Sequence, residues 1–197
     1  DEQSRCVGSV WAVSKLARAL NNVTELNLSG NTFSLVPANF LLGSPSITKV
    51  ILPESVEVIG LTAGSGTYTA QDGTTYSYGR DAFSHMKALE SINFSELTNL
   101  EYIGDHSFSA DINLNLNVQD LPGSLKVIAR KAFGMIDAVN AGETFTSKIT
   151  GDLAGFLEKT GYDKDDATDP GENPDYVWLT EHCFELTSVT AKAEDIA

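Results

Sequence analysis

A short pattern that returns at a fixed interval is the feature that most restricts the fold of this chain. An apolar residue, three further positions, a small residue and phenylalanine occur in this order at residues 103–108, 128–133 and 179–184. A fourth copy is divided by residues 61–78 and ends at Ala82 and Phe83. The phenylalanines that end the copies are separated by 25, 25 and 51 residues: Phe83, Phe108, Phe133 and Phe184. The spacing establishes a repeat with a period near 25 residues, the last interval being nearly two periods.

Short apolar segments that fit β-strands precede these units. In two of them an asparagine separates two apolar residues, at 26–28 and 92–94. Side chains alternate across a strand, so we expect the apolar residues to point inward and the asparagines outward. A unit of this size with one strand cannot bury its own apolar face, and it gains stability only by stacking on a neighbour. The sequence therefore predicts a solenoid with one strand in each repeat.

Two sets of residues carry a family resemblance. Residues 23–33 fit the pattern L-x-x-L-x-L-x-x-N-x-F with Val23 in the first position, and this segment resembles a leucine-rich repeat. The resemblance places Asn31 where that family uses an asparagine to hydrogen-bond the turning backbone. The later units, such as 89–108, resemble the BspA-like leucine-rich repeats of bacterial surface proteins, written L-x-x-I-x-L-P…L-x-x-I-G-x-x-A-F. Three positions depart from this pattern: Ser107, Ala129 and Cys183.

This resemblance implies an α/β fold, a right-handed leucine-rich repeat solenoid with a parallel sheet on its concave face. We expect residues 1–197 to form one domain. Apolar residues at helical spacing between Val10 and Leu20 predict an N-terminal capping helix within residues 1–22. The other divisions are repeats at 23–135 with a hairpin insertion at 61–78, an irregular repeat with an acidic loop at 136–176, and a last repeat at 177–197. Within the irregular part, the spacing of Ile149, Leu153, Phe156 and Leu157 predicts a short helix.

The insertion at 61–78 has the sequence of a β-hairpin. Asp72 and Gly73 lie between two runs rich in threonine and tyrosine, and Asp-Gly favours a two-residue turn. Such a turn pairs Thr69 with Tyr76 and Thr67 with Tyr78. Tyrosine offers a large contact area and a hydroxyl group, so Tyr68, Tyr76 and Tyr78 are candidate ligand contacts. Packing of one hairpin face on the solenoid is the alternative.

Charge and composition exclude several classes of partner. Thirteen Lys and Arg against 27 Asp and Glu give a net charge of −14, which disfavours nucleic acid and anionic lipid. No apolar run approaches the ~20 residues of a transmembrane segment. Cys6 and Cys183 indicate neither a zinc site nor a disulfide framework. The acidic loop at 163–175 could ligate Ca²⁺, but it does not match the EF-hand pattern, and a solvated loop is favoured.

No constellation of catalytic residues is present in the sequence, so we predict a protein that is not an enzyme and needs no cofactor or metal. His106 and His182 occupy the same repeat position, two residues before the phenylalanine. Because they share one position of the repeat, we expect both to be scaffold residues on an outer turn with access to water. Nothing in the sequence places a nucleophile and a carboxylate around either one.

The remaining candidate is a surface. Outward positions of the predicted strands form a polar row along the concave face: Asn27, Lys49, Ile51, Asn93, Asn115 and Asn117. Solenoids bind along such extended faces, although these residues can equally serve only to solvate the sheet. The BspA-like resemblance implies an exported adhesion module, monomeric and extracellular or cell-surface, anchored by a lipid on a segment removed before Asp1. It would bind a host matrix protein, another cell or a glycan. The alternative is a structural spacer or assembly domain of a larger repeat protein.

Overall fold

A computed structural model describes residues 22–61, 67–69, 75–77, 81–129, 131–134, 144–146, 148–152 and 188–190. Within these residues, the regular elements are short β-strands and two turns of 3₁₀ helix. The expected capping helix, the acidic loop at 163–175, His182 and Phe184 lie outside the described residues. Most of the described residues belong to the central part of the chain, between Asn22 and Gly134.

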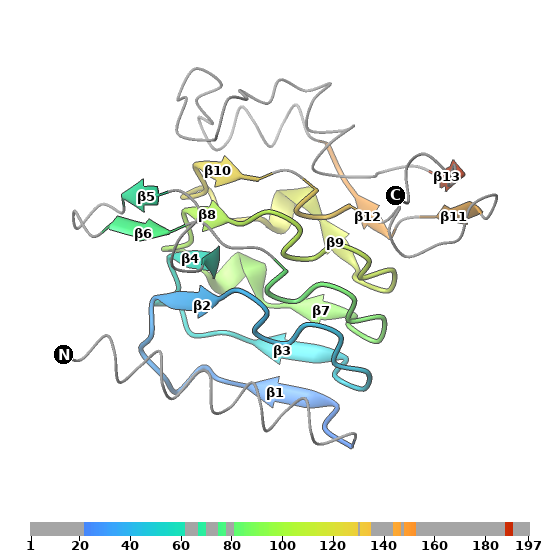
Figure 1. Ribbon diagram of the computed structural model, residues 1–197, viewed down its shortest axis with the longest axis horizontal. Helices are drawn as coiled ribbons and strands as arrows, with labels where there is room; N and C mark the ends of the chain where they lie inside the picture. The colour runs from blue at the N-terminus through green and yellow to red at the C-terminus, as the bar shows by residue number, and fades with distance from the viewer. Residues whose placement is uncertain are drawn as a thin grey trace.

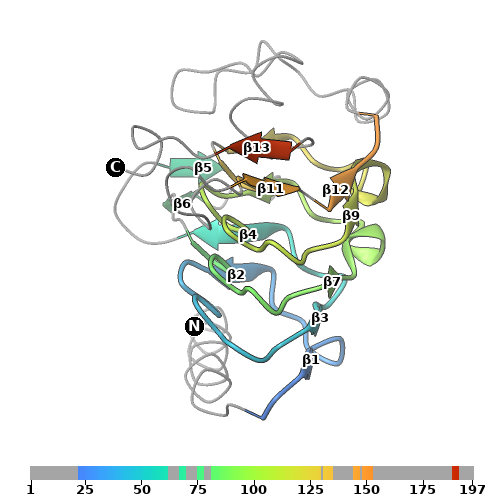
Figure 2. The same cartoon turned by 90° about the vertical axis from the view of Figure 1, so that its right-hand side faces the viewer.

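Parallel strands from successive repeats build two sheets. The first sheet has the order β1-β3-β7, and the second has the order β10-β8-β4-β2. Figure 1 shows both sets of strands following one another in layers, and Figure 2 shows the first sheet along one side. The first sheet comprises β1 (Glu25–Asn27), β3 (Lys49–Ile51) and β7 (Ser91–Ile92). The second comprises β2 (Leu35–Pro37), β4 (Val58–Leu61), β8 (Tyr102–Ile103) and β10 (Val127–Ile128).

A separate two-stranded sheet of β9 (Leu116–Asn117) and β12 (Ile149–Thr150) continues the row of the first sheet toward the C-terminus, and its outer face is described together with that of the first sheet. These two strands pair in parallel, with Ile149 opposite Leu116. The backbone N–H of Asn115 donates to the carbonyl of Glu90 at 3.0 Å, which places β9 beside β7. The helix predicted from Ile149 onward is therefore wrong at its start, because Ile149 is a buried strand residue that extends the stack.

Each complete repeat contributes two strands, and the prediction of one strand in each repeat is wrong. The second strand contains the isoleucine of the repeat pattern, and Ile59 pairs in register with Ile103, as Ile103 does with Ile128. These segments are only two to four residues long. Such short runs show no alternation in the sequence, and their extended backbone is fixed by pairing with the neighbouring repeat.

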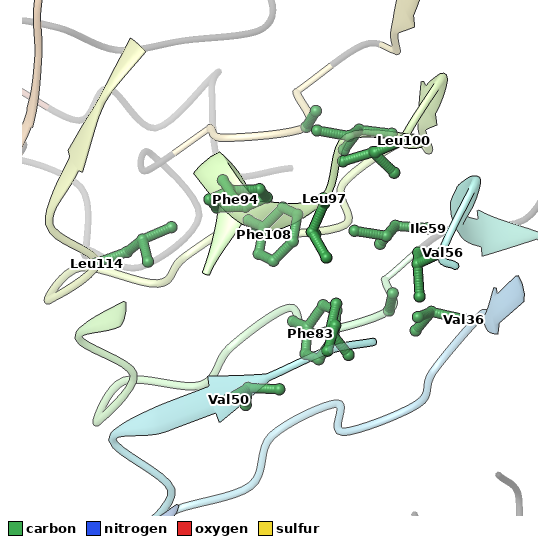
Figure 3. Close-up of a cluster of buried hydrophobic side chains, with 14 of the residues drawn as sticks. Val36, Val50, Val56, Ile59, Phe83, Phe94, Leu97, Leu100, Phe108 and Leu114 are labelled. Carbon is green, nitrogen blue, oxygen red and sulfur yellow. The ribbon is translucent and has the colours of Figure 1, made fainter. Parts of the chain in front are cut away.

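A column of phenylalanine rings runs through the core. Phe83, Phe108 and Phe133 are completely buried, as the repeat pattern predicts. The ring centroids of Phe83 and Phe108 lie 5.1 Å apart at an interplanar angle of 9°, and those of Phe108 and Phe133 lie 5.1 Å apart at 7°. Figure 3 shows Phe83 and Phe108 lying one above the other, with Phe94 beside Phe108. Each stacked pair contributes about 0.5–1.5 kcal/mol beyond the burial of its area.

The phenylalanines are held in a turn with two left-handed backbone positions. The first recurs at Asn39, Asp81, His106 and Lys131, with φ between 50° and 62°. The second lies four residues further on, at Gly43, His85 and Ala110, with φ between 61° and 66°. Backbone hydrogen bonds join the turns of neighbouring repeats, as from Phe83 N to Ser107 O at 2.7 Å. A left-handed residue other than glycine costs about 1–2 kcal/mol, so the ladder of bonds offsets local strain.

Asp111 is a buried acid at the corner between this turn and the first sheet. Its side chain is completely buried, and its Oδ1 accepts a hydrogen bond from Met86 N at 2.8 Å. Within the described residues, Oδ2 has no hydrogen-bond partner. Burial raises the pKa of the Asp111 carboxyl well above its ordinary value of 3.8, and the bond from Met86 lowers it only in part.

Two pairs of antiparallel strands complete the described structure. β5 (Thr67–Thr69) pairs with β6 (Thr75–Ser77), which fits the predicted hairpin insertion, although its turn lies outside the described residues. The predicted register is wrong by one residue: Tyr68 is opposite Tyr76, and Thr69 is opposite Thr75. This register leaves five residues between the paired strand ends, so the connection is longer than the turn that Asp-Gly favours. β11 (Thr144–Thr146) pairs antiparallel with β13 (Ser188–Thr190), unlike the parallel strand of a repeat.

We expect substitution of His85 by glycine to stabilise the fold by about 0.5–1 kcal/mol, because glycine adopts the left-handed conformation without a steric penalty. The control is Lys87→Gly, at an exposed position outside the left-handed region, which should destabilise by about 0.4–1 kcal/mol. Urea unfolding monitored by circular dichroism measures both. An equal loss of stability in the two variants contradicts the role assigned to the turn.

We expect Asp111→Asn to change how stability depends on pH. Between pH 3.8 and the raised pKa, the unfolded carboxyl has lost its proton while the folded one keeps it, so the native protein loses stability as pH rises. Asparagine cannot ionise and keeps an acceptor for Met86. The free energy of unfolding of Asp111→Asn minus that of the wild type should therefore increase with pH in this window, by at most about 1.4 kcal/mol per pH unit.

Urea titrations at pH 4, 6 and 8 measure this difference, with the exposed Asp120→Asn as the control. A difference in the free energy of unfolding that stays constant across these pH values shows that burial does not raise the pKa of Asp111.

Candidate binding surface

The outer face of the first sheet carries the six predicted sheet residues. Asn27, Lys49, Asn115 and Asn117 are exposed, and Ile51 and Asn93 are half-buried. The register places Asn27 directly beside Ile51. Val50 and Leu116 alternate with these residues and are buried in the core. The alternation brings the six side chains to one outer surface, here called the polar face.

Three of the asparagines on the polar face bind the backbone near the strand ends. Asn93 Nδ2 donates to Leu52 O at 3.0 Å, and its Oδ1 accepts from Leu52 N at 2.9 Å. Asn27 Oδ1 accepts from Ser29 N at 3.0 Å, and Asn117 Oδ1 accepts from Gln119 N at 3.1 Å. Asn31, outside the polar face, donates from Nδ2 to Leu28 O at 2.9 Å, as its family position implies. These side chains stabilise the turns that follow the strands.

Lys49 also has a partner on the polar face. Its Nζ lies 3.6 Å from Oε1 of Glu25 on the adjacent strand, and both side chains are about half exposed, at 48% and 49%. An ion pair with this much solvent contact contributes roughly 0–1 kcal/mol. The ammonium group therefore remains available to an incoming ligand at small cost.

Gln119 makes a bridge between repeats that the sequence analysis did not find. Its Nε2 donates to Asp152 O at 2.5 Å, and its Oε1 accepts from Asp152 N at 3.2 Å. Gly151, which directly follows β12, has φ +117°, and a Cβ there would lie 2.4 Å from Gln119 Oε1. In the sequence, only Gly151, directly after Thr150, marks this site.

A cleft of about 230 Å³ lies beside the polar face. It is bounded by the two 3₁₀ turns, η1 (Phe94–Glu96) and η2 (Val118–Asp120), which directly follow Asn93 and Asn117. The sequence analysis missed it, because it forms between two turns that are far apart in the chain. Its lining residues are Ser95, Thr98, Gln119, Asp120, Leu121, Pro122 and Gly123.

The second sheet presents a different outer face. Val58, Tyr102, Val127 and Ala129 form an apolar cluster separate from the main core, and each is at most 4% exposed. Val58, Tyr102 and Val127 are register partners on neighbouring strands. Apolar side chains on both faces are typical of a sheet that is buried on both sides. Among the described residues, the polar row accessible to a partner therefore lies on the first sheet.

The histidines of the described structure take part in turns. The prediction that His106 lies on a water-accessible outer turn is wrong. The residue is buried, has a left-handed backbone, and its Nδ1 bonds with Asp105 Oδ1. His85 is exposed, and its Nδ1 lies 2.7 Å from Oγ of the buried Ser84. Ser84 Oγ in turn donates to the carbonyl of Ser109 at 3.1 Å. The described part of the chain contains no group of three or more His, Cys, Asp or Glu residues suited to a metal ion.

The tyrosines predicted as contacts are only partly described. Tyr68 and Tyr76 are opposite each other in β5 and β6, and Tyr78 lies outside the described residues. The structure therefore relates two of the three tyrosines through backbone register. Their role in binding stays a prediction.

Parallel strands in register, asparagine-capped turns and a stacked phenylalanine column fit a fold of the leucine-rich repeat type. A family model described as "BspA type Leucine rich repeat region (6 copies)" matches residues 67–147. This region of the chain is therefore similar to BspA-type leucine-rich repeats. No curated protein and no solved structure matches the chain. A search of the described residues finds no helix with the length and apolar character of a membrane span.

We expect Asn93→Ala to destabilise the protein by about 2 kcal/mol, because it leaves both backbone groups of Leu52 without their partner. Asn115→Ala is the matched control, since that exposed side chain has no hydrogen bond within the described structure and its loss should change stability by less than about 0.5 kcal/mol. Chemical unfolding of the two variants provides the comparison. Equal effects would show that the bonds to Leu52 do not hold the repeats together.

Proposed function

We propose that this protein is a non-enzymatic binding module at a bacterial cell surface, and that it recognises a protein ligand through the polar face. The observation that carries this proposal is the contrast between the two sheets. One has an exposed polar outer row, and the other is apolar and buried on both sides. Repeats of the BspA type are typical of bacterial surface proteins, often take part in surface interactions and are typically non-enzymatic.

The shape we propose for the whole chain is a right-handed solenoid. Crossover connections between parallel strands are right-handed in about 98% of cases, which supports this hand. Residues 1–22 would cap the N-terminal end of the stack, and the insertion at 61–78 would project from the edge where β4 ends. The antiparallel pairing of β5 with β6 supports the hairpin part of this proposal.

The chemistry of the polar face fits a polypeptide partner. Within the described residues, Nδ2 of Asn27 and Nδ2 of Asn117 donate no hydrogen bond, although their oxygens are engaged. These amide groups can donate to backbone carbonyls of a ligand. Ile51, half-buried beside Asn27, adds an apolar contact at the centre of the row. Hydroxyl groups of a glycan could accept the same bonds, so both ligand classes belong in the test.

The test is retention on a panel of matrix proteins, bacterial cells and glycans. The polar-face variant combines Asn27→Ala, Lys49→Ala and Asn115→Ala, and the control combines Thr32→Ala with Lys87→Ala, at exposed positions outside that face. Loss of three polar contacts should weaken binding about tenfold or more, while the control binds as the wild type does.

Equal retention of the polar-face variant and the wild type overturns the proposed face. No retention of the wild type on any member of the panel, together with assemblies of higher mass in native mass spectrometry, favours the alternative of a structural spacer. Deletion of residues 61–78 tests the hairpin separately, because the tyrosines there belong to a different surface element.

A further inference from the structure

The cleft beside the polar face is built from equivalent positions of two successive repeats. Phe94 and Val118, the first residues of η1 and η2, are both buried and anchor the two turns in the core. Ser95 and Gln119 follow them and line the cleft. The side chains of Leu121 and Pro122 are buried and form its apolar floor, whereas the rim residues Ser95, Thr98, Asp120 and Gly123 are exposed.

The walls of the cleft are fixed by hydrogen bonds made elsewhere in the fold. The Gln119 side chain is bonded to the backbone of Asp152 through both its oxygen and its nitrogen. On the opposite wall, Thr98 Oγ1 donates to Glu54 Oε1 at 2.9 Å. A site whose side chains are already ordered loses little conformational entropy when it binds a ligand. The cleft is therefore pre-organised.

Its size and charge define what fits. Sites for complete small-molecule ligands measure about 300–1,000 Å³, so a cleft of about 230 Å³ suits a single side chain. Asp120 places an exposed carboxylate on the rim, and it has no ion pair or hydrogen bond within the described structure. The whole chain carries a charge of −14, which adds to the attraction of a cation.

We propose that this cleft receives a lysine or arginine side chain from the protein ligand that lies along the polar face. The aliphatic stem would lie over Pro122 and Gly123, and the cationic head would pair with the carboxylate of Asp120. Asn93 and Asn117 on the polar face immediately precede the two turns, so a bound segment reaches the cleft at the end of the strands. This inference rests on the proposed function and specifies a basic partner.

The experiment uses small probes and needs no identified partner. Nα-acetyl-arginine methylamide is titrated into the ¹⁵N-labelled full chain while amide chemical shifts are recorded. The neutral isostere Nα-acetyl-citrulline methylamide is the matched probe. We expect the arginine probe to shift the amides of Ser95, Gln119 and Gly123 in a saturable way, with a dissociation constant on the order of 1 mM or weaker. The citrulline probe should bind about 2- to 5-fold more weakly.

Three variants locate the effect. Asp120→Asn should weaken the binding of the arginine probe about 2- to 5-fold, so that its affinity equals that of the citrulline probe. Gly123→Leu should abolish the shifts, because a Cβ at Gly123 meets no atom within 4 Å and the side chain can occupy the rim without a clash. Glu90→Gln removes one charge from an exposed site outside the cleft and should leave binding unchanged.

The proposal is overturned if the arginine probe shifts none of the cleft amides, if citrulline binds equally well, or if Asp120→Asn and Gly123→Leu have no effect. These failures are distinct from failure of the proposed function. A protein that is retained on the panel through its polar face, yet ignores the arginine probe, binds a partner without a basic anchor in the cleft.

Discussion

The two parallel sheets and the core of this protein depend on contact between neighbouring repeats. The stacked rings of Phe83, Phe108 and Phe133 show this most directly, since each ring is buried against the equivalent ring of the next repeat. Parallel strand pairing imposes the same spacing on the backbone. Side-chain stacking and main-chain hydrogen bonding therefore specify one register together, and a shift of one residue would disrupt both.

The turns around the phenylalanines show what this register requires of the chain. The repeat must reverse direction within a few residues, and it does so with two left-handed positions in the same turn. His106 occupies the first kind of position and His85 the second. Nδ1 of His106 bonds with the carboxylate of Asp105, and Nδ1 of His85 bonds with the hydroxyl of Ser84. Their neighbours in space are set by backbone geometry, and the surrounding bonds serve the scaffold.

The outer faces of the two sheets differ in polarity and in exposure to solvent. On the outer face of the second sheet, the register partners Val58, Tyr102 and Val127 are buried. The outer face of the first sheet exposes amides and an ion pair. Two amides on that face, those of Asn27 and Asn117, accept a bond that closes a turn, and their nitrogens donate none within the described residues. The same residue type thus supports the fold and leaves donors at the surface, which suits a binding module better than a reaction pocket.

The sequence by itself determined the period, the inward phenylalanines and the outward asparagines of the first sheet, because each depends on the spacing of residues along the chain. The role of Asn31 was implied by the resemblance to leucine-rich repeats. Only the tertiary structure decided that Ile59, Ile103 and Ile128 form a second sheet, that Ile149 continues the first as a strand, that His106 is buried, and that Gln119 reaches Asp152 beside a cleft. These features arise between residues of different repeats. Their energies depend on which distant segments become neighbours, and a pattern of residues along one segment does not contain that information.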